Sequence, residues 1–160
     1  MTTEQIVTQM LEMYDLPNER RKMCVLTGGE PSLQVDKHLI DALHAAGFYI
    51  CIETNGTRSL PNGIDWITCS PKEGTKLALH KVNEVKVVFT GTYDPEIWRT
   101  QLEAEHWMLQ PLRYTGEWLI ENMDSWEDDR NDNLDDTVRY ILSHPFWRLS
   151  IQIHKIAGLR

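Results

Sequence analysis

The sequence is poor in cysteine, and its cysteines form no compact metal-binding motif. The 160-residue chain has three, Cys24, Cys51 and Cys69, and they are too far apart for a CxxC or CxxxC pattern. Their odd number and wide spacing also argue against a disulfide framework. We interpret them as small buried residues on strands.

The sequence also lacks a long apolar run and an excess of positive charge. No segment approaches the roughly 20 apolar residues of a membrane span, and the N-terminus shows no basic-then-apolar signal pattern. We therefore expect a cytoplasmic protein with no membrane partner. The formal net charge of −8 argues against a broad nucleic-acid surface, although it allows a local basic pocket for a small anion.

What is present fits a single α/β domain over residues 1–160. Hydrophobic residues make up 41% of the chain, which is enough for a buried core. Short apolar runs bounded by turn residues predict strands at 23–27, 48–53, 64–69, 84–89, 106–110 and 146–153. Helices or crossover loops separate most of these strands, so we expect a mostly parallel sheet.

Helix signals occupy four of the other segments. Thr2 and Gln5 have the spacing of a capping box that starts the first helix, and Gly47 suits the end of the second. Asp94-Pro95 would start the third helix as cap and first helical residue. The apolar residues that mark the last two helices are Ile97, Trp98 and Leu102, which we expect to face inward, and Leu134, Val138, Ile141 and Leu142.

Polar and turn residues follow several predicted strands at their carboxyl ends. Gly28-Gly29 follows the first strand, Asn55-Gly56 the second and Ser70 the third, and Gln110 lies at the end of the fifth. In parallel α/β barrels, ligands bind at that edge of the sheet. We therefore expect a ligand site there.

Two other groups of polar residues carry weaker signals. We interpret the acidic stretch from Glu121 to Asp136 as a solvated loop. A Ca²⁺-binding loop is the less favoured alternative, because the DxDxDG spacing is absent. The histidines that show no ligand spacing, and that we interpret as surface or helix-end residues, are His38, His44, His80, His106 and His144.

The segment Thr27-Gly28-Gly29-Glu30-Pro31 follows a predicted strand and precedes a helix. Two glycines let backbone N–H and C=O groups approach a ligand closely, and such groups can bind both ends of an amino acid. The segment resembles the glycine-rich motif of radical S-adenosylmethionine (SAM) enzymes. With further motifs in the same order, the chain resembles the 7-carboxy-7-deazaguanine synthase family over nearly its whole length: Glu53-Thr54-Asn55-Gly56-Thr57, Ser70-Pro71-Lys72, Glu84-Val85-Lys86, Leu109-Gln110-Pro111 and the ending Leu149-Ser150-Ile151-Gln152-Ile153-His154-Lys155.

The resemblance implies an abbreviated radical SAM barrel, usually in a homodimer. Members of the family convert 6-carboxy-5,6,7,8-tetrahydropterin to 7-carboxy-7-deazaguanine, a ring contraction that releases ammonia on the pathway to queuosine in tRNA. A 4Fe-4S cluster reduces SAM to a 5′-deoxyadenosyl radical, which abstracts a substrate hydrogen; Mg²⁺ assists and SAM is regenerated. The implied partners are therefore SAM and the carboxytetrahydropterin.

The resemblance also implies roles for individual residues, although no catalytic residue and no metal ligand of this chain. Lys72 would supply positive charge to a carboxylate, and His154 could donate a hydrogen bond to the substrate carboxylate. The SAM-binding residues implied are Gly28, Gly29, Glu30, Thr54, Asn55, Ser70, Lys72 and Gln110. The substrate-binding residues implied are Thr27, His154 and Arg160 with its terminal carboxylate.

A purely structural role is the alternative for each of these residues. Glu30 could cap or brace the helix that follows it. Thr54 and Asn55 could be simple turn residues, since Asn-Gly is a common turn pair. Lys72 could be a solvated charge, and His154 a satisfied histidine. Their convergence on one edge of the sheet favours the site interpretation.

The family's opening segment has no counterpart in this sequence. That segment holds a strand, a cysteine-rich loop with CxxxCxxC or an expanded form of it, and a Mg²⁺-contacting threonine. We therefore expect a partial barrel without the first strand and the cluster loop. We also expect the chain alone to be inactive, because three cysteines on separate strands cannot wrap one cluster.

Several interpretations of such a chain stay open. We interpret its start as a truncated gene annotation, an internal start or a deliberate shortening, and dimerisation or strand exchange could cover the uncovered sheet edge. The alternative functions are a catalytically silent module that binds SAM or a purine-like ligand, and a structural fragment. A glycyl-radical activating enzyme is a further option, against which His154-Lys155 so near the C-terminus argues.

Overall fold

The computed structural model describes residues 1–14, 22–112 and 129–152. Within these ranges six strands form one sheet, in which every pair is parallel and neighbours in space are also neighbours in the chain. The strands are β1 (Lys22–Leu26), β2 (Phe48–Thr54), β3 (Trp66–Cys69), β4 (Glu84–Phe89), β5 (His106–Pro111) and β6 (Arg148–Leu149). The helices are α1 (Thr3–Met13), α2 (Lys37–Ala45) and α4 (Asp129–Ser143), with 3-10 turns η1 (Pro31–Leu33) and η2 (Pro95–Thr100).

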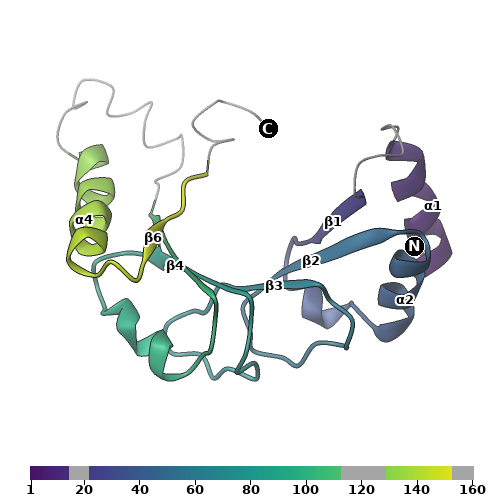
Figure 1. Cartoon of the computed structure of the whole chain (residues 1–160), viewed down its shortest axis with the longest axis horizontal. Helices are drawn as coiled ribbons and strands as arrows, with labels where there is room; N and C mark the ends of the chain where they lie inside the picture. Colours follow the sequence, from purple (N-terminus) through teal and green to yellow (C-terminus); the bar gives the residue numbers. More distant parts are fainter. Residues whose placement is uncertain (15–21, 113–128, 153–160) are drawn as a thin grey trace.

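The sheet is strongly curved, and the helices lie along its convex side (Figure 1). Helices α1 and α2 flank β1 and β2 at one end of the arc, and α4 flanks β6 at the other. The strand order and the crossover helices confirm the predicted α/β class, with the form of a partial, abbreviated barrel. None of the helices in the described ranges has the length and apolar composition of a membrane span.

Alternating burial along the strands divides the sheet into two faces. In β2 the buried residues are every second one, from Phe48 to Thr54, and β4 shows the same alternation. Because successive side chains point to opposite faces, the buried set lies on the helix-covered convex face and the intervening residues lie on the concave face.

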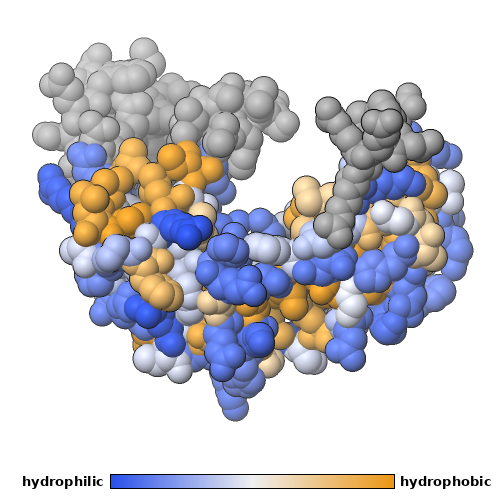
Figure 2. Space-filling model, viewed as in Figure 1, coloured by the Kyte–Doolittle hydropathy of each residue, from blue (hydrophilic) through white to orange (hydrophobic). Residues whose placement is uncertain are grey.

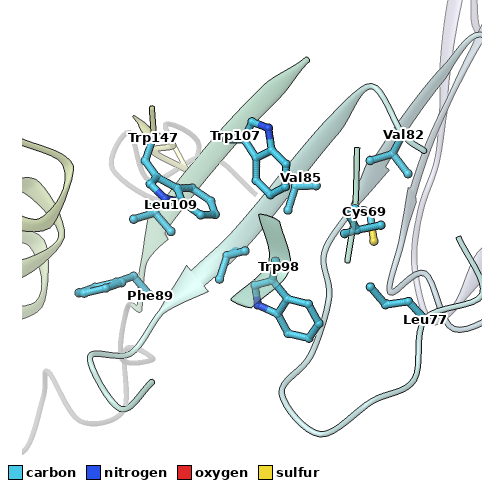
Figure 3. Close-up of a cluster of buried hydrophobic side chains, with 11 residues drawn as sticks. Cys69, Leu77, Val82, Val85, Phe89, Trp98, Trp107, Leu109 and Trp147 are labelled. Carbon is cyan, nitrogen blue, oxygen red and sulfur yellow. The ribbon is translucent and has the colours of Figure 1, made fainter. Parts of the chain in front are cut away.

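Two apolar clusters hold the helices against the convex face. In the first, Ile40 and Leu43 of α2 pack on Phe48 and Ile50 of β2 and on Cys24 of β1. The second cluster lies under β4 and β5 (Figure 3), and the rings of Trp107 and Trp147 meet there edge to face with centroids 5.4 Å apart. Its buried members are Cys69, Leu77, Val82, Val85, Val87, Phe89, Trp98, Leu102, Trp107, Leu109 and Trp147.

Local signals explain where the first two helices begin and end. The predicted capping box of α1 is confirmed: the Gln5 N–H donates to the Thr2 hydroxyl, and the Thr2 N–H donates to the Gln5 side chain. Asp36 caps α2 by accepting the Leu39 N–H at 2.9 Å. Gly47 follows α2 with a φ of +84°, a conformation that suits glycine at a helix C-terminus.

The third predicted helix is a short 3-10 turn, and one of its residues does not face inward. Trp98 and Leu102 are buried as expected, but the side chain of Ile97 is 51% exposed. A 3-10 turn has three residues per turn, so adjacent side chains point about 120° apart and Ile97 cannot share the inward direction of Trp98. The prediction for Ile97 was wrong.

Two further predictions need correction. Residues 129–136 of the acidic stretch begin helix α4 and are not a loop, whereas residues 121–128 lie outside the described residues. The last strand pairs only over Arg148–Leu149, which is shorter than the predicted 146–153, although residue 153 lies outside the described part. Helix α4 ends at Ser143, before Pro145, as predicted.

Candidate functional site

The predicted SAM-binding residues, and the predicted substrate-binding residue Thr27, lie at one edge of the sheet in the described part of the chain. Thr27 follows β1, Thr54 ends β2 and Asn55 follows it, Ser70 follows β3, and Gln110 lies near the end of β5. Because the strands are parallel, these carboxyl ends share one edge. Figure 2 shows the molecule hollowed between the two ends of the sheet, which gives a ligand room on the concave side. His154 and Arg160 lie outside the described residues.

The Gly28-Gly29 turn leaves its backbone open to solvent. Gly28 has a φ of +113°, which a residue with a side chain rarely adopts. A Cβ built on either glycine would have no heavy atom within 4 Å. Open space therefore lies over both residues, and their N–H and C=O groups are accessible to a ligand.

Hydrogen bonds to Glu30 link this turn to the end of β2. Its carboxylate accepts the Thr54 hydroxyl at 2.6 Å, the Asn55 N–H at 2.8 Å and the Ser32 N–H at 3.1 Å. Partial desolvation opposes ionisation, but the hydrogen bonds from Thr54, Asn55 and Ser32 outweigh it and lower the pKa of Glu30. The geometry thus supports the bracing alternative for Glu30, and a SAM contact by this side chain stays a prediction.

The next two loops are also internally bonded. The Asn55 side chain accepts the Thr57 N–H at 2.9 Å and its hydroxyl at 2.7 Å, which is a local turn. The Ser70 N–H donates to the Thr54 carbonyl at 2.7 Å, so the loops after β2 and β3 are joined. Lys72 is exposed and forms no ion pair with any residue in the described ranges. Its ammonium group is therefore accessible to an anion.

The concave face carries a polar row that was not predicted from the sequence. Lys86 of β4 donates to the Glu53 carboxylate of β2 at 2.8 Å, and the Thr68 hydroxyl donates to Glu84 at 3.3 Å. The residues in register across four strands are Glu53, Thr68, Glu84 and His106. Local patterns gave no sign of this row, because it depends on which strands are neighbours.

His106 differs from its predicted place at the surface or a helix end. It is half-buried at the start of β5, and its ring stacks on Trp66 with centroids 5.5 Å apart and an angle of 22° between planes. The Trp66 indole N–H donates to the Thr68 hydroxyl at 3.1 Å. Trp66 and His106 are the first residues of β3 and β5, and His106 is the member of the polar row on β5.

The three cysteines do not fit an iron–sulfur cluster. Cys24 and Cys69 are buried on the convex side, whereas Cys51 is half-buried and alternates with the buried residues of β2. Desolvation raises the pKa of Cys24 to about 11 and of Cys69 to about 12, and it also raises the pKa of Cys51. Cluster ligation requires thiolates that converge, so these residues are not a ligand set. No group of three potential metal ligands occurs among the described residues.

Comparison with known proteins agrees with the motifs. No model of a protein family matches the chain. It is 48% identical over 136 residues to the 7-carboxy-7-deazaguanine synthase of Bacteroides thetaiotaomicron, covering 85% of this chain and 64% of that protein. It is 45% identical over 136 residues to the synthase of Bradyrhizobium diazoefficiens, covering 85% of this chain and 59% of that protein.

A third relative matches over almost the whole chain. The 7-carboxy-7-deazaguanine synthase of Synechocystis sp. is 31% identical over 159 residues, which are 98% of this chain and 70% of that protein. The chain therefore spans less than two thirds of the first two relatives and somewhat more of the third. These similarities, together with the parallel half-barrel and its glycine-rich edge, place the chain in the 7-carboxy-7-deazaguanine synthase family.

Proposed function

We propose that this chain forms the SAM- and pterin-binding portion of an enzyme that converts 6-carboxy-5,6,7,8-tetrahydropterin to 7-carboxy-7-deazaguanine. The observation that carries the proposal is that residues from four of the family's motifs, at the carboxyl ends of β1, β2, β3 and β5, share one edge of a parallel half-barrel. Because the chain spans only part of its relatives' length, the activity, the substrate and the homodimer are all proposals for this chain.

The carboxyl edge of the sheet offers complementary groups for SAM. The open backbone of Gly28 and Gly29 would bind the methionyl amino group, and the Lys72 ammonium would bind the carboxylate. Gln110, which is in register with Val88 on the concave face, would approach the adenine. When bound beside a reducing cluster, SAM supplies a carbon-centred radical that abstracts hydrogen from a substrate.

The pterin would lie deeper, over the polar row of the concave face. Thr27 at the rim, with His154 and Arg160 beyond the described residues, would contact the pterin, and His154 would donate a hydrogen bond to its carboxylate. A pterin ring has N–H donors on its edge, and the Glu53 carboxylate is an acceptor that the sheet presents on the same face. The ring-contraction steps themselves need groups that the described residues do not supply.

A catalytically silent ligand-binding protein is the second candidate function. The observation that favours it is the placement of Cys24, Cys51 and Cys69, which do not converge. Both functions share the SAM site, so the first experiment tests binding and the second tests chemistry.

Calorimetric titration of the purified chain with SAM tests the shared site. We expect Lys72→Met to weaken binding about tenfold, because it removes a charge-assisted hydrogen bond. Lys37→Met is the matched control, since Lys37 is also exposed but lies on α2 at the convex side. The proposed SAM site is wrong if the unaltered chain fails to bind SAM, or if the two variants behave alike.

Anaerobic reconstitution with iron and sulfide separates the two functions. Four bound irons with a visible charge-transfer band, followed by turnover of the carboxytetrahydropterin, would support the enzyme and would overturn the conclusion that Cys24, Cys51 and Cys69 are not a ligand set. SAM binding with neither iron nor turnover would support the silent binding protein for this chain. The Mg²⁺ requirement that the resemblance implies can be tested in the same turnover assay.

A further inference from the structure

We infer that Lys86 is a positioning residue that holds the Glu53 carboxylate toward the pterin on the concave face. This inference rests on the proposed function and adds a residue for which the motifs gave no role. Lys86 and Glu53 are 33 positions apart in the chain, and the Lys86 ammonium lies 2.8 Å from Glu53 Oε1.

The ion pair bridges two strands that are not neighbours. Glu53 is on β2 and Lys86 on β4, so their side chains meet above β3. Thr68 of β3 is in register with Glu53 and with Glu84, which precedes Lys86 by two positions, but its hydroxyl donates to Glu84 and accepts the Trp66 indole N–H. Lys86 is therefore the cation that contacts Glu53 among the described residues.

Stability alone does not explain this pair. The two side chains are 21% and 43% exposed, and ion pairs with such exposure contribute little to folding. On the concave face, however, the pair fixes one oxygen of Glu53. No described residue donates a hydrogen bond to Glu53 Oε2, so this second oxygen can accept an N–H from a ligand.

The two residues that follow Glu53 further restrict its position. Thr54 and Asn55 come next in the chain and are bound to Glu30 at the rim. Lys86 thus holds Glu53 on the concave face, and Glu30 holds the next residue, Thr54, on the convex face. A carboxylate held in this way accepts a hydrogen bond without losing the rotamer entropy that a mobile glutamate would lose.

Titration with 6-carboxypterin, the oxidised and air-stable relative of the proposed substrate, tests the inference. We expect Lys86→Met to weaken binding about tenfold and Lys86→Arg to restore most of it. Lys37→Met is the matched control, and unchanged SAM affinity in every variant shows that the fold and the rim are intact.

A double-mutant cycle distinguishes positioning from direct contact. If Lys86 acts through Glu53, Lys86→Met has no further effect on 6-carboxypterin affinity in a Glu53→Gln background. An equal effect in both backgrounds would mean that Lys86 contacts the ligand itself and would overturn the inference. Wild-type affinity in Lys86→Met would overturn it as well.

A ligand-free measurement keeps the inference separate from the proposed function. If 6-carboxypterin does not bind the unaltered chain, the pterin-site proposal fails, but the order of the Glu53 side chain can still be measured. Carbon-13 relaxation of labelled glutamate should show Glu53 ordered in the unaltered chain and in Lys86→Arg, and mobile in Lys86→Met. Equal mobility in all three would refute the positioning role.

Discussion

Replacing Gly56 with alanine tests whether packing, as well as backbone conformation, fixes the Asn55-Gly56 turn beside the candidate site. Gly56 has a φ of +76°. A Cβ at this position would lie 2.6 Å from the Cys69 sulfur and 3.2 Å from a methyl carbon of Leu77. Both neighbours are buried in the second apolar cluster, so neither can move away freely.

The expected cost has two parts. Holding a residue with a Cβ in the left-handed region costs about 1–2 kcal/mol, and overpacking a filled core costs about 1–3 kcal/mol. Gly91→Ala is the matched control, because Gly91 has a φ of +74° but no heavy atom within 4 Å of its Cβ position. Only the backbone part applies there, and the effect of alanine on the unfolded chain is common to both variants.

Urea denaturation of the two variants measures the difference directly. We expect Gly56→Ala to lower the free energy of unfolding by about 1–3 kcal/mol more than Gly91→Ala does. Adding Cys69→Ala should reduce the cost of Gly56→Ala, since it removes the sulfur that the new methyl group meets. Equal losses for the two glycine variants would refute the packing argument.

Three further predictions concern stability and accessibility. Glu30→Gln should lower the free energy of unfolding by about 1–3 kcal/mol at pH 7. Because the folded-state pKa of Glu30 is lowered, the stabilisation by its carboxylate is present above the unfolded-state pKa and is lost as the pH falls through the folded-state pKa. The unfolding free energies of the two proteins, measured by urea denaturation, should therefore converge in acid. In the same assay, Ile40→Ala at a buried side chain should lower the free energy of unfolding by about 2–5 kcal/mol. Leu33→Ala, at a side chain that is 58% exposed, should change the free energy of unfolding by less than about 0.5 kcal/mol. Alkylation followed by mass spectrometry should leave Cys24 and Cys69 unmodified in the folded chain and modify them in denaturant, and rapid labelling of the folded chain would contradict their burial.

Much of the fold could be predicted because its signals are local. The capping box at Thr2 depends on residues three positions apart, and the strand at 48–53 was predicted from one apolar run closed by Asn55-Gly56. The wrong prediction for Ile97 also came from a local signal, because an Asp-Pro start suits both an α-helix and a 3-10 turn. The sequence around Pro95 does not decide between them.

The site could be predicted only in part, because some of its residues are defined by non-local pairing. Gly28 and Gly29 carry a local signal, and the structure leaves their backbone open as that signal requires. Lys86 and Glu53 carry none, since their contact depends on β2 and β4 both lying beside β3. Each residue stood inside a recognised motif, yet nothing in either motif indicated the other as its partner.

The alternation of β2 gives two neighbouring residues different tasks. Thr54 points to the convex side and joins Glu30, so changes there act mainly on the rim and on stability. Glu53 points to the concave side and joins Lys86, where the exposure of both side chains makes the contribution to stability small. A variant that leaves the unfolding free energy intact but weakens pterin binding should therefore come from the Glu53–Lys86 pair, whereas a Glu30 variant should change stability first.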